Sequence, residues 1–450
     1  MTTTPCASTE KPVDVFTALV DWLRTAVSTE EHFTLWYSAE ASDFIRFNQA
    51  KVRQAGHVQQ AEATLKLIQG ERHANFKVAL SGDPVADRSS LQDALTSLRK
   101  IVATLPADPY LLMDTSPWRS ENIQPGDLAS AGEISEQVTT LAKGQDLVGF
   151  YAGGPVYRGF ASSWGSFGWH EASSCTFDWS LFEPQGNAVK SMYASTYWDS
   201  SKVAMQMDSA QRQLAHFGKP TRQLSPGEYR AYLAPAALNE VVGLLNWGSF
   251  SARQLATKRS ALQKLHSGQM SLSPLVSWRE QASGSLSPAF TPAGFQRQDK
   301  QLVEAGKMVG QLVSPRSARE YGLTQNGASN GENSQSLVME AGTLATEDIL
   351  KTLGTGLYIG NLWYLNYSDM TVARLTGMTR FACFWVENGE IVAPVSTMRF
   401  DDSIFNFLGS SLEAVTQNRD LCVSDSTYGQ RHTDSTLLPG VLTSRFTLTL

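Results

Sequence analysis

Residues 354–395 read GTGLYIGNLWYLNYSDMTVARLTGMTRFACFWVENGEIVAPV, and this stretch decides the fold. It follows a predicted short helix, Glu347–Leu353, which Gly354 would end as a C-terminal stop. Gly356 and Gly360 fit positions where a strand packs closely against its neighbours. A dinucleotide-binding loop has the opposite order, a strand and then a helix, so these glycines do not predict a nucleotide site. We expect strands and turns to alternate from here to the C terminus.

Working outward from this stretch, the hydrophobic pattern divides the chain into units of mixed helical and strand character. Helical spacing of apolar residues and short strand-like runs occur together in the first two units, and strand patterns dominate the last. The sequence therefore predicts an α+β protein. The predicted parts are a disordered lead-in at 1–11, an N-terminal α+β domain at 12–105, a central mixed domain at 106–227 and a β-rich C-terminal domain at 228–450.

Three local predictions are specific enough to compare with a structure. Residues 33–37 and 44–47 read as two separate short strands, because a polar stretch divides them. Residues 106–135 are rich in Pro, Asp, Ser and Gly and are typical of a connecting segment. Residues 252–265 have the spacing of one helix that is mostly polar on one face.

Composition excludes several classes of protein. The chain has 450 residues, with 37 Lys and Arg against 43 Asp and Glu, so its formal net charge is −6. Its basic residues are dispersed, whereas nucleic-acid binding needs a basic patch that neutralises phosphates. The most apolar stretch, 233–247, is too short for a span of about 20 residues, so we expect no membrane partner. Four scattered cysteines do not predict a disulfide scaffold.

The N terminus predicts a cytoplasmic location. It reads MTTTPCASTEK and lacks the basic region and apolar core of a secretory signal. Free thiols and a mildly acidic composition agree with this compartment.

One short segment, from His170 to Cys175, has the residue types of a metal site. A histidine and a thiolate near Glu171 could bind zinc and supply a general base, with a distant ligand such as His432. The surrounding residues read as a strand, in which positions five apart point to opposite faces. We therefore expect half-buried strand residues, and a non-standard zinc site remains the alternative.

A set of motifs resembles the TldD/PmbA family of metallopeptidase-like proteins, which is also named for peptide maturation and gyrase modulation. The block Phe384-Trp-Val-Glu-Asn-Gly-Glu-Ile391, placed after Gly356-Leu-Tyr-Ile-Gly-Asn-Leu362, carries most of the resemblance. The supporting matches are Phe44-Ile-Arg-Phe-Asn48, Val52-Arg-Gln54, Ser225-Pro-Gly-Glu-Tyr229, Glu340-Ala-Gly342 and Leu375-Thr-Gly377. The resemblance covers the chain from about residue 33 to the end and implies the same three-part α+β layout.

The resemblance also implies that the zinc ligands of the family are missing. The TldD branch has an H-E-x-x-x-H motif and a C-terminal Cys, and the PmbA (TldE) branch lacks them. Here Asn246 and Ser251 fall at the two His positions, Trp247 at the Glu and Tyr428 at the Cys. Between 241 and 263 there is no His or Glu. Asn and Ser are poor zinc ligands, and an indole cannot transfer the proton of a bound water.

We therefore expect a protein with no catalytic residues and no cofactor of its own. It would be the non-catalytic, metal-free subunit of a cytosolic peptide-processing dimer, whose partner is a zinc-bearing TldD-like subunit or a second copy. The segment 357–367 would form a wall of a peptide chamber, or else an ordinary core strand. The predicted peptide-binding residues are Gly356, Tyr358, Gly360, Asn361 and Trp363. Two alternatives stay open: a zinc peptidase active alone through His170 and Cys175, and a peptide-binding scaffold homodimer without catalysis.

Overall fold

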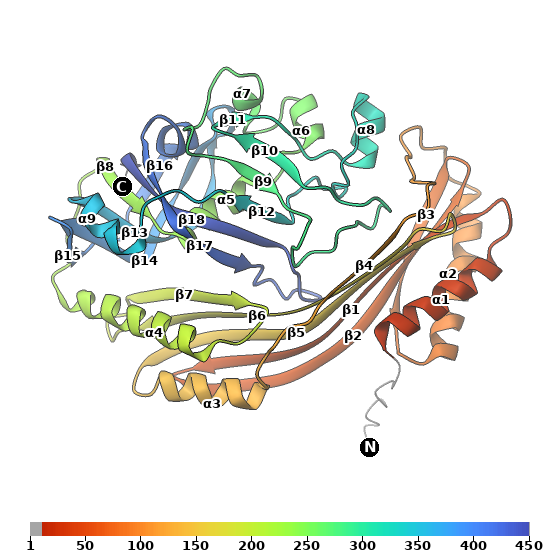
Figure 1. The fold of residues 1–450 in the computed structure, drawn as a ribbon, viewed down its shortest axis with the longest axis horizontal. Coiled ribbons are helices and arrows are strands. Elements are labelled where there is room, and N and C mark those ends of the chain that lie inside the picture. Colours follow the sequence, from red (N-terminus) through yellow and green to blue (C-terminus); the bar gives the residue numbers. More distant parts are fainter. Residues whose placement is uncertain (1–10, 450) are drawn as a thin grey trace.

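The computed structural model describes residues 11–449, so the expected lead-in at 1–11 lies outside the described residues except for Lys11. It is an α+β fold built on two sheets, which confirms the predicted class (Figure 1). The helices are α1 (Pro12–Ala26), α2 (Pro84–Val102), α3 (Ala131–Leu141), α4 (Ser200–Ala215), α5 (Pro235–Leu245), α6 (Ala252–Ala256), α7 (Gln263–His266), α8 (Pro315–Tyr321) and α9 (Ile349–Leu353).

The first sheet has seven strands in the order β3-β2-β1-β5-β6-β4, and β7 also pairs with β6. All of these pairs are antiparallel except β4 with β6. Its long strands curve beneath the second sheet, so that one face of the first sheet is turned toward the C-terminal part of the chain (Figure 1). The strands are β1 (His32–Asn48), β2 (Lys51–Gln69), β3 (Arg72–Leu80), β4 (Arg119–Gln124), β5 (Asp146–Ser162), β6 (Phe167–Phe182) and β7 (Ala188–Ser195).

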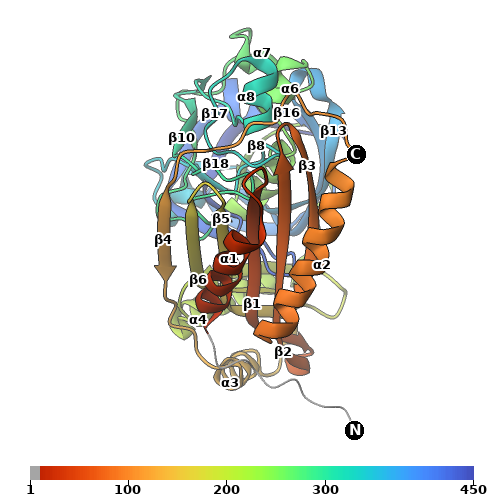
Figure 2. The same ribbon diagram turned by 90° about the vertical axis from the view of Figure 1, so that its right-hand side faces the viewer.

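Helices cover the outer face of this sheet. Figure 2 shows α1 and α2 lying across its strands at one end, and their apolar stripes, which include Phe16 and Leu95, are fully buried there. At the other end α3 and α4 pack on the sheet through residues such as Ile134 and Met207. Asp83 caps α2 and Ser130 caps α3, so the first free N–H groups of both helices are satisfied.

The second sheet has eleven strands and contains a closed ring. The ring runs β18-β16-β14-β13-β8 and closes because β8 pairs with β18 again. The apolar helix α5 packs on β13 and β18 and buries Leu238 and Val241 completely. The strands are β8 (Gly227–Leu233), β9 (Trp278–Glu280), β10 (Lys300–Glu304), β11 (Lys307–Met308), β12 (Ser336–Met339), β13 (Gly356–Asp369), β14 (Arg374–Glu387), β15 (Glu390–Pro394), β16 (Arg399–Ser403), β17 (Leu412–Val423) and β18 (Ser435–Leu448).

Three local predictions are wrong for identifiable reasons. The two short strands at 33–37 and 44–47 form one strand, β1, because the polar residues between them face the C-terminal part of the chain rather than solvent. The segment 106–135 is not only a connection, since it contributes β4 to the sheet edge. The helix expected at 252–265 divides into α6 and α7, because Lys258 adopts a left-handed conformation.

The first sheet takes strands from both residues 12–105 and residues 106–227, and these strands hydrogen-bond to one another through β1 and β5.

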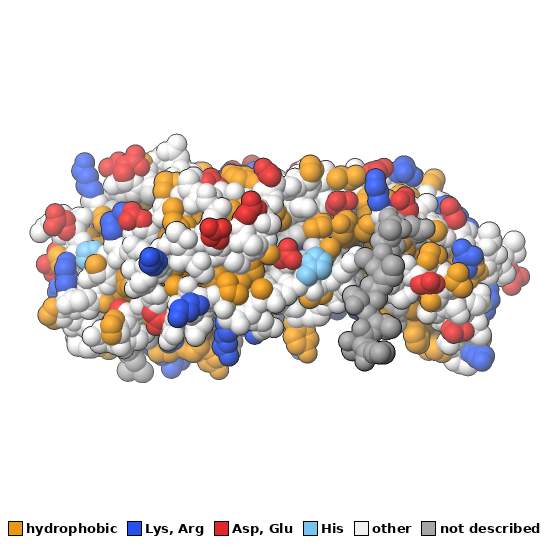
Figure 3. Space-filling model, turned by 90° about the horizontal axis from the view of Figure 1, so that it is seen from below, with side chains coloured by type: hydrophobic (Ala, Val, Ile, Leu, Met, Phe, Trp, Pro, Cys, Tyr) orange, Lys and Arg blue, Asp and Glu red, His pale blue; other side chains and the backbone are white. Residues whose placement is uncertain are grey.

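On the face seen from below, basic and acidic side chains are interspersed (Figure 3). No helix within residues 11–449 is both long enough and apolar enough to span a bilayer.

Candidate functional site

The predicted ligand positions lie where α5 ends rather than on one helical face. Asn246 is the C-terminal cap of α5, and Ser251 is the N-terminal cap of α6. A motif of the form H-E-x-x-x-H places its ligands by helical geometry. In this chain the intervening residues form a turn, so the helical arrangement is lost.

Each of these side chains already has partners within the protein. The Asn246 amide donates from Nδ2 to the Ser334 carbonyl at 2.9 Å and accepts at Oδ1 from the Ser334 N–H at 2.6 Å. The Ser251 hydroxyl donates to the carboxylate of Glu332 and accepts the Gln254 N–H. The segment 332–334 therefore occupies the hydrogen-bonding groups of both positions.

Two buried glutamates hold this segment, and neither was singled out from the sequence. Burial raises the pKa of Glu332, but the hydrogen bond from the Ser251 hydroxyl, together with those from the N–H groups of Arg253 and Ser314, lowers it below its usual value. Glu280 forms a buried ion pair with Arg297 and accepts the Ser334 hydroxyl. A buried carboxylate that accepts this many hydrogen bonds typically has a structural role and holds the donor segments together. The one sequence signal was the polar composition of residues 324–336, which include Glu332 but not Glu280.

The other two ligand positions do not join this cluster. Trp247 is 76% exposed, and Tyr428 is 95% exposed in the connection between β17 and β18. The neighbour of Tyr428, Gly429, accepts a hydrogen bond from Gln60 on β2, so this connection lies on the first sheet. An amide, a hydroxyl, an indole and a phenol in this arrangement do not fit a zinc ion. Within residues 11–449, no three His, Cys, Asp or Glu side chains form a group suited to a metal.

The alternative metal residues are also separated. His170 donates from Nε2 to the Leu286 carbonyl at 2.9 Å, and its Nδ1 lies 3.4 Å from Asn122 Nδ2. Burial lowers the pKa of His170 to about 4. Cys175 is in the core beneath α3 and α4, where burial raises the pKa of its thiol to about 12. Both residues are fully buried rather than half-buried, and β6 turns them to opposite faces.

The predicted peptide-binding segment is mostly packed inside the second sheet. Gly356 and Gly360 allow close approach, because a Cβ would collide with the Arg230 and the Ala382 carbonyl respectively. Tyr358 packs on the aromatic rings of β8 and β14, and Asn361 is buried. Trp363 alone of the five is exposed, at 46%.

The structure instead contains two adjoining cavities between the first sheet and the β17–β18 connection, with volumes of about 360 and 530 Å³. Both are lined by Arg46, Phe150 and Thr427. We call these two cavities together the inter-sheet groove. Sequence reasoning missed it because its walls come from segments almost 400 residues apart.

A buried arginine fixes the upper wall of the inter-sheet groove. Arg431 donates from Nη1 to the Gly154 carbonyl at 2.9 Å and from Nη2 to the Ser174 carbonyl at 2.8 Å. The Arg431 carbonyl in turn accepts from Arg158 at 3.0 Å. Glu40 accepts from Ser42 at 2.7 Å, so the floor beneath the connection is a satisfied polar network.

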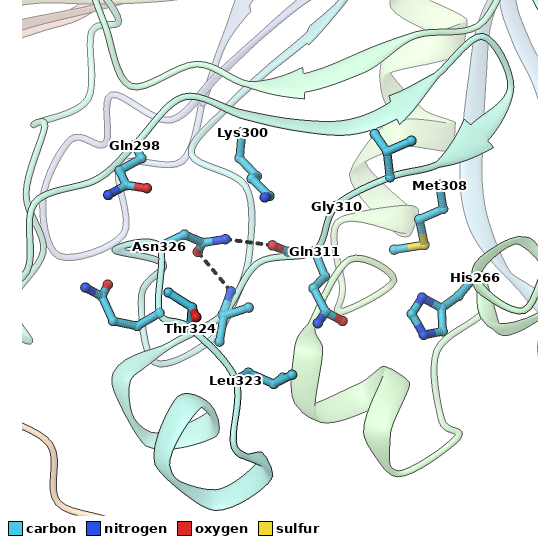
Figure 4. Close-up of a pocket in the computed structure, with 12 residues that line it drawn as sticks. His266, Gln298, Lys300, Met308, Gly310, Gln311, Leu323, Thr324 and Asn326 are labelled. Atoms are coloured by element: carbon cyan, nitrogen blue, oxygen red, sulfur yellow. Dashed lines mark hydrogen bonds between the residues drawn. The ribbon is translucent and has the colours of Figure 1, made fainter.

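A further cavity, of about 380 Å³, lies between β11 and the 311–326 segment (Figure 4). Asn326 shapes it by donating to the Gln311 carbonyl at 2.7 Å and accepting the Val313 N–H at 3.0 Å. Its lining offers amides, Lys300 and His266, but no carboxylate or thiol. It therefore lacks the paired groups that acid–base or nucleophilic catalysis requires.

Comparison with known sequences identifies one family. Residues 226–450 match the family model described as the PmbA/TldA metallopeptidase C-terminal domain. Metalloprotease PmbA of Escherichia coli O157:H7 is 33% identical over 113 residues, which are 25% of this chain and 24% of that protein. A Metalloprotease PmbA homolog of Haemophilus influenzae is 29% identical over 126 residues, 28% of this chain and 27% of that protein. The chain thus matches about a quarter of the length of these curated relatives.

Comparison with solved structures shows a shared fold along almost the whole chain. A Thermotoga maritima protein described as a modulator of a DNA gyrase has a TM-score of 0.75 at 14% identity and covers 98% of this chain and 100% of its own. TldE from Thermococcus kodakarensis has a TM-score of 0.74 at 14% identity, with coverage of 97% and 100%.

Proposed function

Because the chain belongs to the PmbA/TldD family of metallopeptidase-like proteins, we propose that it is the non-catalytic, metal-free subunit of a cytosolic peptide-processing dimer. This proposal rests on the surroundings of the four expected ligand positions. The side chains of Asn246 and Ser251 form hydrogen bonds with the segment 332–334, and those of Trp247 and Tyr428 lie on the surface.

The chemistry of these side chains supports the absence of catalysis by this chain alone. A zinc peptidase needs three protein ligands and an acid–base group that deprotonates the bound water. Freeing the Asn246 amide for a metal would leave the buried N–H and C=O of Ser334 without partners. The zinc and its general base would therefore come from a partner subunit that carries the H-E-x-x-x-H motif.

The role left for this chain is to bind and position peptide. The inter-sheet groove is large enough for several residues of an extended chain, and its floor is a β-sheet face. Its upper wall is held by buried hydrogen bonds, which gives the preformed shape that a binding site needs.

The proposal is tested by expressing the chain with an H-E-x-x-x-H relative from the same source. We expect a 1:1 complex by size-exclusion chromatography with light scattering, one zinc per complex by elemental analysis, and cleavage of fluorogenic peptides. The chain alone should hold less than a tenth of a zinc per subunit and cleave nothing. A relative whose motif Glu is changed to Gln is the control, and should pair but not cleave.

Two results would overturn the proposal. Chelator-sensitive cleavage by the chain alone, lost in His170→Ala, would favour an independent zinc peptidase. A stable homodimer that does not form a complex with the relative would favour a peptide-binding scaffold without catalysis.

A further inference from the structure

The smaller cavity of the inter-sheet groove, of about 360 Å³, has a gap in its floor where one side chain is missing. Four residues of β2 line this cavity in alternation, so that they share one face of the strand: Gln54, Gly56, Val58 and Gln60. A Cβ added at Gly56 would meet no atom of the described chain within 4 Å. We call the open space above Gly56 the Gly56 notch.

The fold gives no reason for a glycine at this position. Gly56 does not have a positive φ, its register with β1 is regular on both sides, and no atom of the described chain crowds its Cβ position. A glycine inside a strand weakens the strand, because it has more entropy to lose and no side chain to pack. Where no bulge or bend explains it, such a glycine is typical of a place where a ligand approaches the backbone.

Apolar side chains surround the Gly56 notch. Gly56 pairs in register with Phe44 on β1, whose ring stacks on that of Phe150 on β5, with the ring centres 6.0 Å apart and the planes at 17°. Both rings are only half-buried, and Val58, the next residue of β2 on this face, is 37% exposed. An aromatic or large aliphatic group in the notch would bury this apolar surface and extend the aromatic stack.

Polar side chains close the two ends of the notch. At one end Gln60 donates from Nε2 to the carboxylate of Glu40 and to the Gly429 carbonyl at 2.7 Å. At the other end the guanidinium of Arg46 lies 5.8 Å from the ring centre of Phe150. The described lining of this cavity carries one carboxylate and one guanidinium, so its net charge does not select the ligand. An apolar centre between a few fixed polar groups is the usual composition of a ligand site.

We propose that the Gly56 notch is the subsite for one aromatic or large aliphatic side chain of an extended peptide. This inference rests on the proposed function and names the substrate class of the groove. The cavity volume of about 360 Å³ lies near the lower end of the range for ligand pockets, about 300–1,000 Å³, so it suits one side chain with its adjoining backbone. A nucleic acid fits less well, because its phosphates require an excess of cations that the described lining does not have.

The test measures binding rather than cleavage. Four ten-residue peptides with the same terminal fluorophore, identical except for Phe, Leu, Ala or Glu at one central position, are titrated into the full chain and followed by anisotropy. We expect the Phe and Leu peptides to bind roughly tenfold more tightly than the Ala peptide, and the Glu peptide no more tightly than the Ala peptide. The preference should persist from low to high salt, because screening acts on charges and not on apolar contacts.

Filling the notch should abolish this preference. In Gly56→Leu the new side chain would occupy the notch, so the Phe peptide should bind as weakly as the Ala peptide. Ala55→Leu is the matched control, because Ala55 is exposed and its side chain points to the opposite face of β2, and it should retain the preference. Val58→Ser removes part of the exposed apolar wall and should reduce the preference severalfold. An unchanged melting temperature checks that each variant is folded.

Several results would overturn the inference. These are equal affinity for the Phe and Ala peptides, an unchanged preference in Gly56→Leu, loss of the preference in Ala55→Leu as well, or tighter binding of a single-stranded oligonucleotide than of the Phe peptide. The same titration on the complex with the zinc-bearing relative separates the two proposals. Pairing and cleavage without the Phe preference would refute only the subsite, and the Phe preference in a chain that does not pair would refute only the dimer.

Discussion

The side chain of Asn246 pairs with the backbone of Ser334 through two hydrogen bonds, one from Nδ2 to the carbonyl and one from the N–H to Oδ1. In this geometry the asparagine side chain makes the two hydrogen bonds that the backbone of a neighbouring strand would make. It connects the end of α5 to a segment 88 residues later, and it explains why a side chain that cannot serve as a good zinc ligand is useful at this position.

Replacing Asn246 with Ala should lower the free energy of unfolding by about 2–3 kcal/mol, because the buried polar groups of Ser334 lose their partners. Chemical denaturation followed by tryptophan fluorescence measures the change. Asn75→Ala, at an exposed position of β3, should stay within about 0.5 kcal/mol of the parent. Equal stability of both variants would mean that water replaces the Asn246 amide without cost.

Installing the motif residues should not create a zinc site. The triple variant Asn246→His, Trp247→Glu, Ser251→His restores the residue types, but its ligands lie on either side of a turn rather than on a helix. We expect less than a tenth of a zinc per chain and a lower melting temperature, because Glu332 loses the Ser251 hydroxyl. Trp247→Glu alone changes an exposed side chain and should leave the melting temperature unchanged. Stoichiometric zinc in the triple variant would contradict this account.

Glu31 should make stability depend on acid pH. Its hydrogen bonds with Arg99 lower the pKa of Glu31 to about 2, so its contribution is complete above about pH 4.5 and disappears as the pH falls through 2. Glu31→Gln should cost about 3 kcal/mol at pH 7. The difference from the parent should narrow between pH 4.5 and 2. Glu30→Gln, at the exposed neighbouring position, should show neither effect.

The architecture was predictable where one local motif carries it. The glycine-punctuated strands from Gly356 to Ile391 pointed to the C-terminal sheet. Strand lengths were not predictable, because β1 pairs with β2 and β5 straight through the polar stretch around Glu40, whose side chain finds its partners in distant segments such as the β17–β18 connection. A pattern search treats such a polar stretch as a break.

The candidate site, like the fold, was predictable from the sequence only in part. The residues at the expected ligand positions followed from the resemblance to a family motif, because the motif is nearly contiguous in sequence. The inter-sheet groove was not, because Arg46 and Thr427 meet only after both sheets have formed. The one available signal was the Arg-containing match at 44–54, which carried no indication of its partner.

His170 should oppose folding at low pH. Burial lowers the pKa of His170 to about 4 in the folded protein. In the unfolded chain its pKa is about 6.5, so between pH 6.5 and 4 the unfolded state binds a proton that the folded state does not. Stability should therefore fall by about 3 kcal/mol between these pH values. His170→Gln can still donate to the Leu286 carbonyl and should remove this dependence. His266→Gln, at an exposed position, should retain it, and loss of the dependence there would contradict the assignment.

Arg431 should control the order of the β17–β18 connection. Arg431→Gln removes charged donors from the buried carbonyls of Gly154 and Ser174 and should cost about 3 kcal/mol. Because the connection is then held less firmly, chymotrypsin should cleave after the exposed Tyr428 roughly tenfold faster, as measured by mass spectrometry over a time course. Arg72→Gln, at an exposed strand end, should leave the cleavage rate unchanged. If Arg431→Gln cleaves at the parental rate, the connection is held by contacts other than this arginine, and the upper wall of the inter-sheet groove does not depend on it.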